Sequence, residues 1–412
     1  PVSGPVLAGD RVVWADARRD GGFDVRSALV AGGDRRTLLT MRGHASEYFQ
    51  PRLAASAQVV AVEAIEHQRG RDDPQRFSGR FTFAGPPTGP LDRVGERCGL
   101  SETVRPRSID VSGDSFAYMT CGRRIEVRRI GSPLPPEQFD GNLRGLRLAG
   151  RYVAWVDREL GGVTVYDRMT RGAAYHLDEQ RTGGVGGIDL ADDGTVAIGS
   201  LQTLSVASPA EPSMRGLPVA GERTYHPTIA GGTVAFSRAR DRSRPGPGGE
   251  VGTVRLDGGE RLLARGPAFD VYEPTADFDG SRVAYFTYNC SDATIHVVDA
   301  DSAARSFGQR RGCPFALARA PRVKSSLRAV LLDIDCFGFD GETCGAERIE
   351  LTRDGRRMGS ARFGTTVPLT AAARAALRRT GRLRVRATGI FRDRPGRRER
   401  RTSTLTLKRP GS

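Results

Sequence analysis

One short pattern recurs along the first three quarters of the chain and constrains the fold more than any other feature. Its clearest copy is the stretch from Pro274 to Phe286, in which an apolar run leads into Asp279-Gly280 and a second apolar run, Val283-Ala284-Tyr285, follows. Asp-Gly tolerates the positive φ that a two-residue turn requires, and the flanking residues favour strands. The stretch therefore predicts a β-hairpin.

Seven copies of this hairpin align on a small residue in the second strand, at Val13, Ala61, Ala117, Ala154, Ala197, Ala235 and Ala284. Their mean spacing of about 45 residues is typical of four-stranded propeller blades. One blade cannot bury both of its apolar faces, whereas seven blades in a ring cover one another. We therefore expect an all-β fold with a seven-bladed β-propeller over residues 1–318.

A β-solenoid and an array of β-sandwiches are the two alternatives to the propeller. A β-solenoid has shorter repeats, and an array of β-sandwiches would not repeat one hairpin at this interval. The segment Val2 to Leu7 is expected either as the inner strand of the first blade or as a strand that completes the seventh blade.

The order of residues within the repeat resembles the TolB-like β-propeller repeat. A proline, a short apolar run, Asp-Gly and then Val-Ala-Tyr or Val-Ala-Phe carry this resemblance. The copies at Pro227 and Pro274 match best, and Pro51 lies at the corresponding place in the second copy. The family includes binding, scaffolding and catalytic members, so the resemblance implies the fold more than the function.

Residues 319–412 have a different composition and predict a second domain. Glu347–Thr352 and Arg382–Thr388 alternate apolar and polar residues, as half-buried strands do. Thr370 to Arg379 predicts a helix, with Thr370 as its cap and Gly381 as its stop. The segment is expected to form a small β-sandwich. It resembles the Ig-like domains appended to actinobacterial extracellular proteins.

The positive charge of the chain is concentrated in this second domain. The whole chain has a formal net charge of +15, and the part from Pro321 onward contains 22 Lys and Arg against 9 Asp and Glu. Almost every basic residue is Arg, which is typical of a GC-rich genome. The basic strands lack the interleaved aromatic side chains of single-strand-binding surfaces, so nucleic acid is not the expected partner. An anionic cell-wall polymer or a merely solvated face remain the alternatives.

The six cysteines fall in three neighbouring pairs, Cys98 with Cys121, Cys290 with Cys313, and Cys336 with Cys344. An even number of cysteines in close pairs indicates disulfides and an oxidising compartment. Zinc is the alternative, but no pair has a two-residue gap and no histidine lies nearby. We expect three sequential disulfides in a protein that is secreted or held at the cell surface.

The most suggestive recurrence for a ligand site is Tyr-x-Pro before the inner strand. Tyr225-His226-Pro227 and Tyr272-Glu273-Pro274 share it, and Tyr48 precedes Pro51 in a related stretch. In a propeller this segment lies near one mouth of the central channel, where residues from several blades converge. Tyr48, Tyr225, His226, Tyr272 and Glu273 are therefore the candidate lining. The alternative is that the tyrosines pack between blades.

No complete catalytic constellation is present in the sequence. Gly-x-Ser-x-Gly and His-Glu-x-x-His motifs are absent, and the five histidines are scattered. Two carboxylate clusters were considered for calcium, Asp189/Asp192/Asp193 and Asp333/Asp335/Asp340/Glu342, but neither has the spacing of a calcium loop. No metal site and no cofactor are expected, and calcium is the alternative.

These observations favour a binding protein over an enzyme. We expect a monomer that binds a protein or glycan of the cell envelope through one propeller face and performs no catalysis. The alternative is a propeller polysaccharide lyase or another glycoside-cleaving enzyme with its site at the channel mouth. A third class is a purely structural envelope scaffold. The sequence has no apolar run long enough to span a membrane, and it begins at Pro1 without Met, which suggests a mature or trimmed chain.

Overall fold

The chain divides into two compact units, each with its own apolar core. The first unit contains Pro1–Thr287 and Ala293–Gly308, and the second contains Tyr288–Asp292 and Gln309–Ser412. The structure is a computed structural model. It describes residues 3–18, 20–43, 47–68, 76–95, 98, 109–121, 124–140, 143–157, 162–178, 185–200, 203–219, 224–239, 249–266, 276–289, 292–307, 316–317, 321–332, 334–335, 346–362, 366–392 and 398–409.

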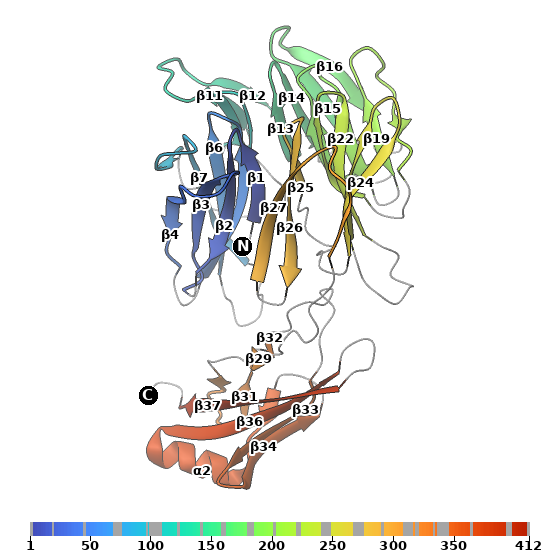
Figure 1. The fold of residues 1–412 in the computed structure, drawn as a ribbon. Coiled ribbons are helices and arrows are strands. Elements are labelled where there is room, and N and C mark those ends of the chain that lie inside the picture. Colours follow the sequence, from blue (N-terminus) through green and yellow to red (C-terminus); the bar gives the residue numbers. More distant parts are fainter. Residues whose placement is uncertain are drawn as a thin grey trace. The chain divides into compact units, whose positions relative to one another are not determined.

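The first unit consists of consecutive sheets whose strands follow one another in chain order (Figure 1). The first sheet contains β1 (Ser3–Ala8), β2 (Arg11–Ala17), β3 (Phe23–Leu29) and β4 (Arg36–Met41). The second contains β5 (Glu47–Ala55), β6 (Val60–Gln68), β7 (Arg76–Gly85) and β8 (Asp92–Arg93). The third contains β9 (Ile109–Ser112), β10 (Ser115–Met119), β11 (Arg124–Arg129) and β12 (Glu137–Asp140).

The remaining sheets of the first unit continue this order. The fourth contains β13 (Leu143–Ala149), β14 (Tyr152–Asp157), β15 (Val163–Asp167) and β16 (Gly172–Leu177). The fifth contains β17 (Val185–Leu190), β18 (Val196–Ser200), β19 (Leu204–Ala207) and β20 (Arg215–Gly216). The sixth contains β21 (Thr224–Ala230), β22 (Thr233–Ala239), β23 (Gly249–Arg255), β24 (Glu260–Gly266) and β28 (Arg305–Ser306). The seventh contains β25 (Ala276–Phe278), β26 (Arg282–Asn289) and β27 (Asp292–Asp299).

The first two strands of each sheet are the predicted hairpins. The small residue on which the copies align is fully buried in every sheet, at Val13, Ala61, Ala117, Ala154, Ala197, Ala235 and Ala284. One detail of the turn differs from the expectation. In the seventh sheet Asp279 and Arg282 face each other, so Gly280 and Ser281 form the turn, and Gly280 adopts the positive φ of 98°. Asp279 precedes the turn, and its carboxylate accepts hydrogen bonds from the backbone N–H groups of Ser281 and Arg282.

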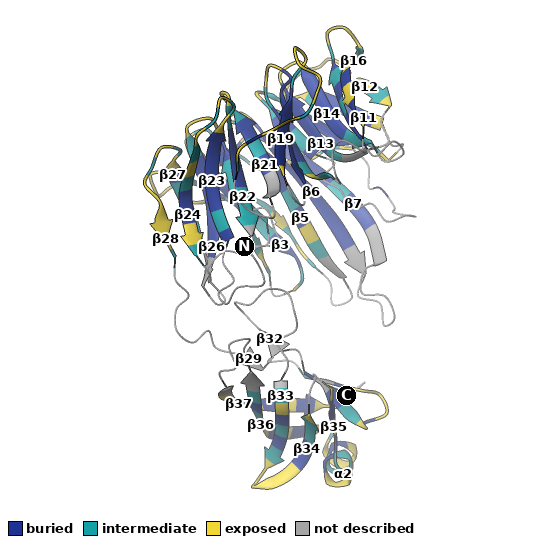
Figure 2. Ribbon diagram, turned by 90° about the vertical axis from the view of Figure 1, so that its right-hand side faces the viewer, coloured by how far each residue is buried: buried dark blue, intermediate teal, exposed yellow. Residues whose placement is uncertain are grey.

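The first strands of neighbouring sheets pack against one another in a closed cycle. Along the chain, β1 packs against β5, β5 against β9, β9 against β13, β13 against β17, β17 against β21, β21 against β25, and β25 against β1. Apolar clusters fill the spaces between sheets, for example Val25 with Val62 and Val165 with Ile198. Figure 2 shows buried residues along the strands and exposed residues at many of the turns. This all-β arrangement is consistent with a β-propeller.

The two ends of the first unit show how the cycle of sheets begins and ends. The sequence left two places open for Val2 to Leu7, and the structure agrees with the first of them. The first strand β1 pairs with β2, so it belongs to the first sheet and does not complete the seventh. The seventh sheet has three strands among the described residues, because β28 pairs in parallel with β24 of the sixth sheet. The cycle is therefore closed between β25 and β1 by side-chain contacts and not by a shared sheet.

The second unit contains four-, three- and two-stranded sheets and one described helix. The larger sheet has the order β34 (Arg356–Arg362), β33 (Ala346–Arg353), β36 (Arg382–Arg392) and β37 (Arg398–Lys408). The smaller sheets contain β30 (Arg322–Val323), β31 (Ala329–Leu331) and β35 (Thr366–Pro368), and β29 (Ala316–Leu317) and β32 (Ile334–Asp335). Helix α2 (Ala371–Thr380) begins after Thr370, whose side chain accepts a hydrogen bond from Ala373 N–H, and ends at Gly381 with φ 66°. Both caps agree with the sequence.

One apolar cluster forms the core of the second unit. It joins Val330 of β31 and Val367 of β35 to Leu351 of β33 and Val385 of β36, and Leu377 of α2 packs into it. The larger sheet therefore buries one face and exposes the other. No helix in the described part of the chain is both long and apolar enough to cross a membrane.

Substitution of Asp277 tests the closure between β25 and β1. The Asp277 carboxylate accepts a hydrogen bond from the buried Leu7 N–H at 2.6 Å. Asp277→Ala removes this acceptor, and we expect the free energy of unfolding of the first unit to fall by about 1–3 kcal/mol. Urea titration followed by tryptophan fluorescence measures this, because Trp14 and Trp155 both lie in the first unit.

Asp257→Ala is the matched control for this substitution. Asp257 pairs with Arg255 at 2.7 Å on the exposed surface, and such a pair contributes little to stability. An unfolding midpoint for Asp277→Ala as close to the wild type as that of the control would contradict the account of the closure.

Candidate functional site

The candidate lining lies at the start of first strands, where the structure describes it. Tyr48 is in β5 and its backbone pairs with His67 of β6. Tyr225 and His226 are in β21, where Tyr225 pairs with Ser237 and the register shifts between Tyr225 and Thr228. The side chains of these residues, and Tyr272 and Glu273 altogether, lie outside the described part of the chain. Because β5 and β21 belong to the second and sixth sheets, the described candidates are not neighbours in the cycle.

Several first strands contain an irregularity just before their hairpin. The register shifts between Ser3 and Val6 in β1, between Arg144 and Leu146 in β13, and between Tyr225 and Thr228 in β21. A bulge changes the direction of side chains and is frequent next to binding sites. In β21 the bulge coincides with the Tyr-x-Pro motif, whose recurrence in the sequence is a separate indication of a ligand site.

The residues that pair with the buried small residues occupy equivalent places on the first strands, which we call the junction position. They are Val6, Ala54, Asp110, Arg147, Asp189, Thr228 and Asp277. Polar and charged residues at this position are unexpected in strands that pack against neighbours on both sides. Their contacts explain their presence.

Three aspartates at the junction position connect one sheet to the next. Asp110 of β9 accepts the Leu148 N–H of β13 at 2.7 Å, and Asp189 of β17 accepts the Ile229 N–H of β21 at 2.7 Å. Asp277 makes the same bond to Leu7. In each case the donor is the residue that follows the junction position of the next sheet. A hydrogen bond to an ionised acceptor is roughly twice as strong as a neutral one.

Arg147 extends this pattern between the fourth and fifth sheets. Its side chain is 5% exposed, and its Nε lies 2.9 Å from Oδ1 of Asp189. Its Nη1 also donates to the Leu146 carbonyl at 2.7 Å. The guanidinium and carboxylate thus satisfy each other and the adjacent backbone, as a buried ion pair requires. Chemically, these groups are suited to holding sheets together.

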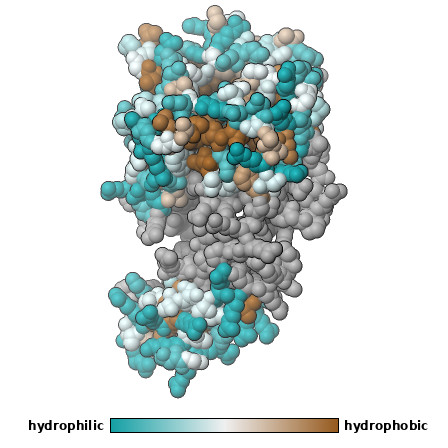
Figure 3. Space-filling view, in the orientation of Figure 1, coloured by the Kyte–Doolittle hydropathy of each residue, from teal (hydrophilic) through white to brown (hydrophobic). Residues whose placement is uncertain are grey.

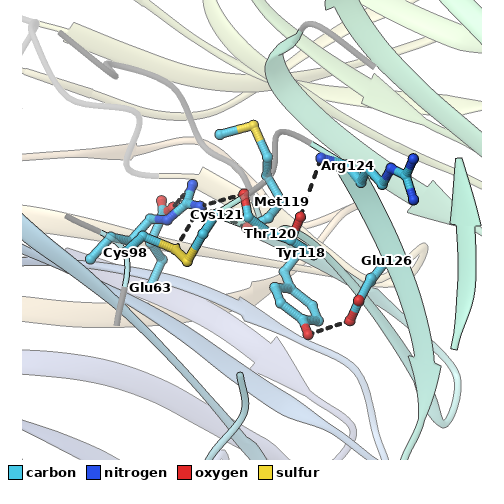
Figure 4. The surroundings of a disulfide bond; sticks show 9 residues. Glu63, Cys98, Tyr118, Met119, Thr120, Cys121, Arg124 and Glu126 are labelled. Carbon is cyan, nitrogen blue, oxygen red and sulfur yellow. Dashed lines mark hydrogen bonds and ion pairs between the residues drawn. A yellow bond between two sulfur atoms is a disulfide. The ribbon is translucent and has the colours of Figure 1, made fainter. Parts of the chain in front are cut away.

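The junction between the second and third sheets is held by a disulfide and a buried arginine. Cys98 and Cys121 are joined, with their Cα atoms 5.1 Å apart, so this one of the predicted pairs is present. The Arg80 side chain donates to the Met119 carbonyl at 2.7 Å and the Thr120 carbonyl at 3.1 Å, and lies 3.7 Å from Glu63. Figure 4 shows Glu63, Met119 and Thr120 grouped around the disulfide.

The ion pair of Arg80 with Glu63 was not predicted from the sequence. Glu63 interrupts the apolar run over residues 60–65 of β6, and this interruption is the local sequence signal that a partner is buried nearby. In the structure the Glu63 side chain is 2% exposed. The partner itself lies on another strand and has no sequence signature. The other predicted disulfide cysteines, Cys290, Cys313, Cys336 and Cys344, lie outside the described residues.

The disulfide is expected to stabilise the first unit. Its two cysteines are 23 residues apart, and closing a loop of that length is worth about 3 kcal/mol in the chain-entropy account. Cys98→Ser combined with Cys121→Ser should lower the free energy of unfolding by roughly that amount, measured by tryptophan fluorescence in urea. The single variant Ser115→Ala in the same sheet is the control. An unchanged midpoint in the double variant would show that the bond contributes nothing in solution.

His296 lies in β27, the third strand of its sheet, and packs against aromatic rings. Its ring stacks on Tyr285 with centroids 5.1 Å apart and lies 4.7 Å from the Phe307 ring. Its Nε2 is 2.7 Å from the Thr287 hydroxyl. Burial, and to a lesser degree the charge of Arg305, lowers the pKa of His296. The neutral imidazole is therefore the form that the fold accommodates.

This environment predicts a pH dependence of stability. Because the folded pKa of His296 lies below the unfolded value of about 6.5, the unfolded chain binds the proton more readily. Stability from this group is complete above that value and decreases as the pH falls below it. Melting temperatures of the full chain near pH 7.5 and pH 5.5 should therefore differ more in the wild type than in His296→Gln, which keeps a hydrogen-bonding group. Equal differences in the two proteins would refute this role.

The described residues contain no group of three or more His, Cys, Asp or Glu side chains that could hold a metal ion. Within the first calcium candidate, Asp189 contacts Ile229 and Arg147, and Asp193 accepts the Thr195 N–H at 2.8 Å in its own hairpin turn. The side chains of the second candidate, Asp333, Asp335, Asp340 and Glu342, lie outside the described residues.

Comparison with known proteins finds solved structures of similar fold but no related sequence. No family model and no curated protein sequence matches the chain. Among solved structures, TolB from Acinetobacter baumannii is 12% identical, with a TM-score of 0.39 over 62% of this chain and 78% of that one. Hsv2 from Kluyveromyces lactis is 10% identical, with a TM-score of 0.41 over 72% and 97%. Apo AztD from Citrobacter koseri is 11% identical, with a TM-score of 0.41 over 72% and 82%.

At these identities and TM-scores the likeness carries no argument about function. The fold of the chain rests on its own strand pairing and on the cycle of its first strands.

Proposed function

We propose that the chain is a secreted or cell-surface binding protein that recognises a protein or glycan of the cell envelope through one face of its first unit and performs no catalysis. In this proposal the first unit is a seven-bladed, TolB-like β-propeller, and the second is an Ig-like β-sandwich that acts as a spacer or contacts the envelope. The protein acts as a monomer.

The cycle of first strands supports the seven-bladed assignment. Each sheet contributes one first strand, and the contact of β25 with β1 returns the cycle to its start. The Ig-like assignment rests on the second unit, where two antiparallel sheets contribute to one apolar core. The Cys98–Cys121 disulfide supports an oxidising compartment, and the preference for Arg over Lys supports an actinobacterial source.

One observation carries the choice of binding over catalysis. The aspartates at the junction position, Asp110, Asp189 and Asp277, accept backbone N–H groups of the following sheet. A carboxylate whose oxygen is committed to such a bond is held in place between two sheets, which suits it to structure and not to proton transfer. Because these carboxylates serve the fold, we favour the mouth of the ring as the recognition surface. In β21 this region contains both a bulge and the Tyr-x-Pro motif.

The test is a binding screen with substitutions in β21. The full chain is screened against purified envelope glycans and envelope proteins, and the affinity for each hit is measured for the wild type, Tyr225→Ala and His226→Ala. Aromatic contact residues dominate interface energetics, so we expect about a tenfold loss of affinity in at least one variant. His176→Ala is the control, since His176 lies in the outer strand β16 and bonds to Thr164.

A glycan that is cleaved during the same screen would overturn the proposal in favour of a polysaccharide lyase or another glycoside-cleaving enzyme. Equal affinity of all variants for every hit would place the recognition surface elsewhere and contradict the role of the ring mouth.

A further inference from the structure

The exposed face of the larger sheet in the second unit has an unusual charge distribution. Along β36, Leu383, Val385 and Ala387 are buried, and the alternate residues Arg382, Arg384 and Arg386 are exposed. The strands β33 and β37 alternate in the same way, with Leu351, Leu405 and Leu407 in the core. The solvent side of this sheet, which we call the arginine face, therefore consists of the polar residues of these strands.

The register of the sheet places the basic residues side by side. Arg382 pairs directly with Lys408, and Arg348 pairs directly with Arg362. Arg384 and Arg386 face Thr406 and Thr404, which are also exposed. Like charges directly opposite each other in an antiparallel pair are destabilising. A GC-rich codon preference accounts for Arg in place of Lys at most of these positions, but it does not explain why cations face each other.

Few carboxylates on this face oppose the positive charge. Glu350 lies on it and is 3.8 Å from Arg348, and both side chains are exposed. For Arg382, Arg384 and Arg386 the structure shows no ion pair with any described residue, and none of them belongs to the apolar core. Figure 3 shows that the surface of the second unit visible in that view is mostly hydrophilic. A cationic face with few internal counterions is suited to an external anion.

The geometry of the face indicates the kind of anion. Alternate residues of a strand are about 7 Å apart, so Arg382, Arg384 and Arg386 present a guanidinium at that interval along a nearly straight line. A chain of phosphodiesters joined by a three-carbon polyol also advances by about 7 Å per repeat when extended, from six single bonds. The planar guanidinium donates two parallel hydrogen bonds to a phosphate, and the threonine hydroxyl groups supply further donors.

The same face is a poor match for nucleic acid. None of its described residues is aromatic, so bases of a single strand would find no stacking partner. The face belongs to a four-stranded sheet, and it presents no helix that could enter a groove of a duplex. We propose that the arginine face binds an extended polymer of polyol phosphates or sugar phosphates. This binding is independent of any ligand of the first unit.

The test compares matched losses of charge in the full chain. The face variant is Arg382→Gln with Arg384→Gln and Arg386→Gln. The control is Arg374→Gln with Arg378→Gln and Arg379→Gln on α2, the helix whose Leu377 packs into the core on the other side of the sheet. Affinity for fluorescently labelled poly(glycerol phosphate) of defined length is measured by anisotropy over a range of salt concentrations. A thymidine oligonucleotide with the same number of phosphates is the comparison probe.

We expect the face variant to bind poly(glycerol phosphate) at least about tenfold more weakly at low salt, and the control to stay within about twofold of the wild type. The slope of log affinity against log salt should fall by about two in the face variant, since each phosphate contact contributes roughly 0.7 for a flexible chain. The melting temperature of the face variant should not fall, because Arg382→Gln relieves the repulsion with Lys408.

Three results would overturn the proposal. Equal losses in both variants would mean that net charge alone is sensed. Equal or tighter binding of the thymidine oligonucleotide would favour a nucleic-acid surface. Absence of any binding of poly(glycerol phosphate) by the wild type at low salt would remove the partner.

Discussion

A carboxylate on the first strand of one sheet that accepts the backbone N–H of the next sheet is the interaction on which the first unit depends. A four-stranded antiparallel sheet satisfies its own backbone groups only on the sides that pair, and the first strand of each sheet has an unpaired edge. Asp110, Asp189 and Asp277 supply the acceptors for that edge at three junctions. The bonds join sheets that do not share a strand, so apolar packing and these bonds together hold the cycle closed.

The small residues of the second strands make this arrangement possible. With Ala284 fully buried opposite Asp277, the sheets approach closely enough for a short side chain to reach the neighbouring backbone. A larger residue would separate the sheets and remove the bond as well as the packing. The functional consequence is that polar groups in the middle of the ring serve the fold. In our proposals, recognition involves the ends of the first strands, and polymer binding involves the arginine face of the second unit.

Much of this fold could be predicted from local patterns. The hairpins, the buried small residues, the cap of α2 by Thr370 and the Cys98–Cys121 pair follow from turn chemistry, periodicity and cysteine spacing, which act over short stretches of chain. The junction bonds could not be predicted in this way. Asp189 resembled part of a calcium cluster or a turn, because the Ile229 N–H that it binds is 40 residues away. The parallel pairing of β28 with β24 was missed for the same reason.

The candidate site was the hardest part to predict. The motif around Tyr225 identified a bulged strand start, but a motif cannot show which side chains from different sheets meet. Arg80 illustrates the limit. Its ion pair with Glu63 depends on the register of β6 against β7, and its bonds to Met119 and Thr120 depend on how the second and third sheets meet. The alternation of apolar and basic residues in β36, in contrast, was evident in the sequence. The structure adds that Arg382 lies directly opposite Lys408, and the proposed role of the arginine face depends on this placement of cations side by side.

Residue-resolved hydrogen exchange tests the central claim most directly. The amides of Leu7, Leu148 and Ile229 donate across the junctions, and each is expected to exchange only when the whole first unit unfolds, at the rate of the slowest amides in the hairpins. Exchange of these three amides at the rate of exposed turns, while the amides paired within each sheet stay protected, would contradict the account.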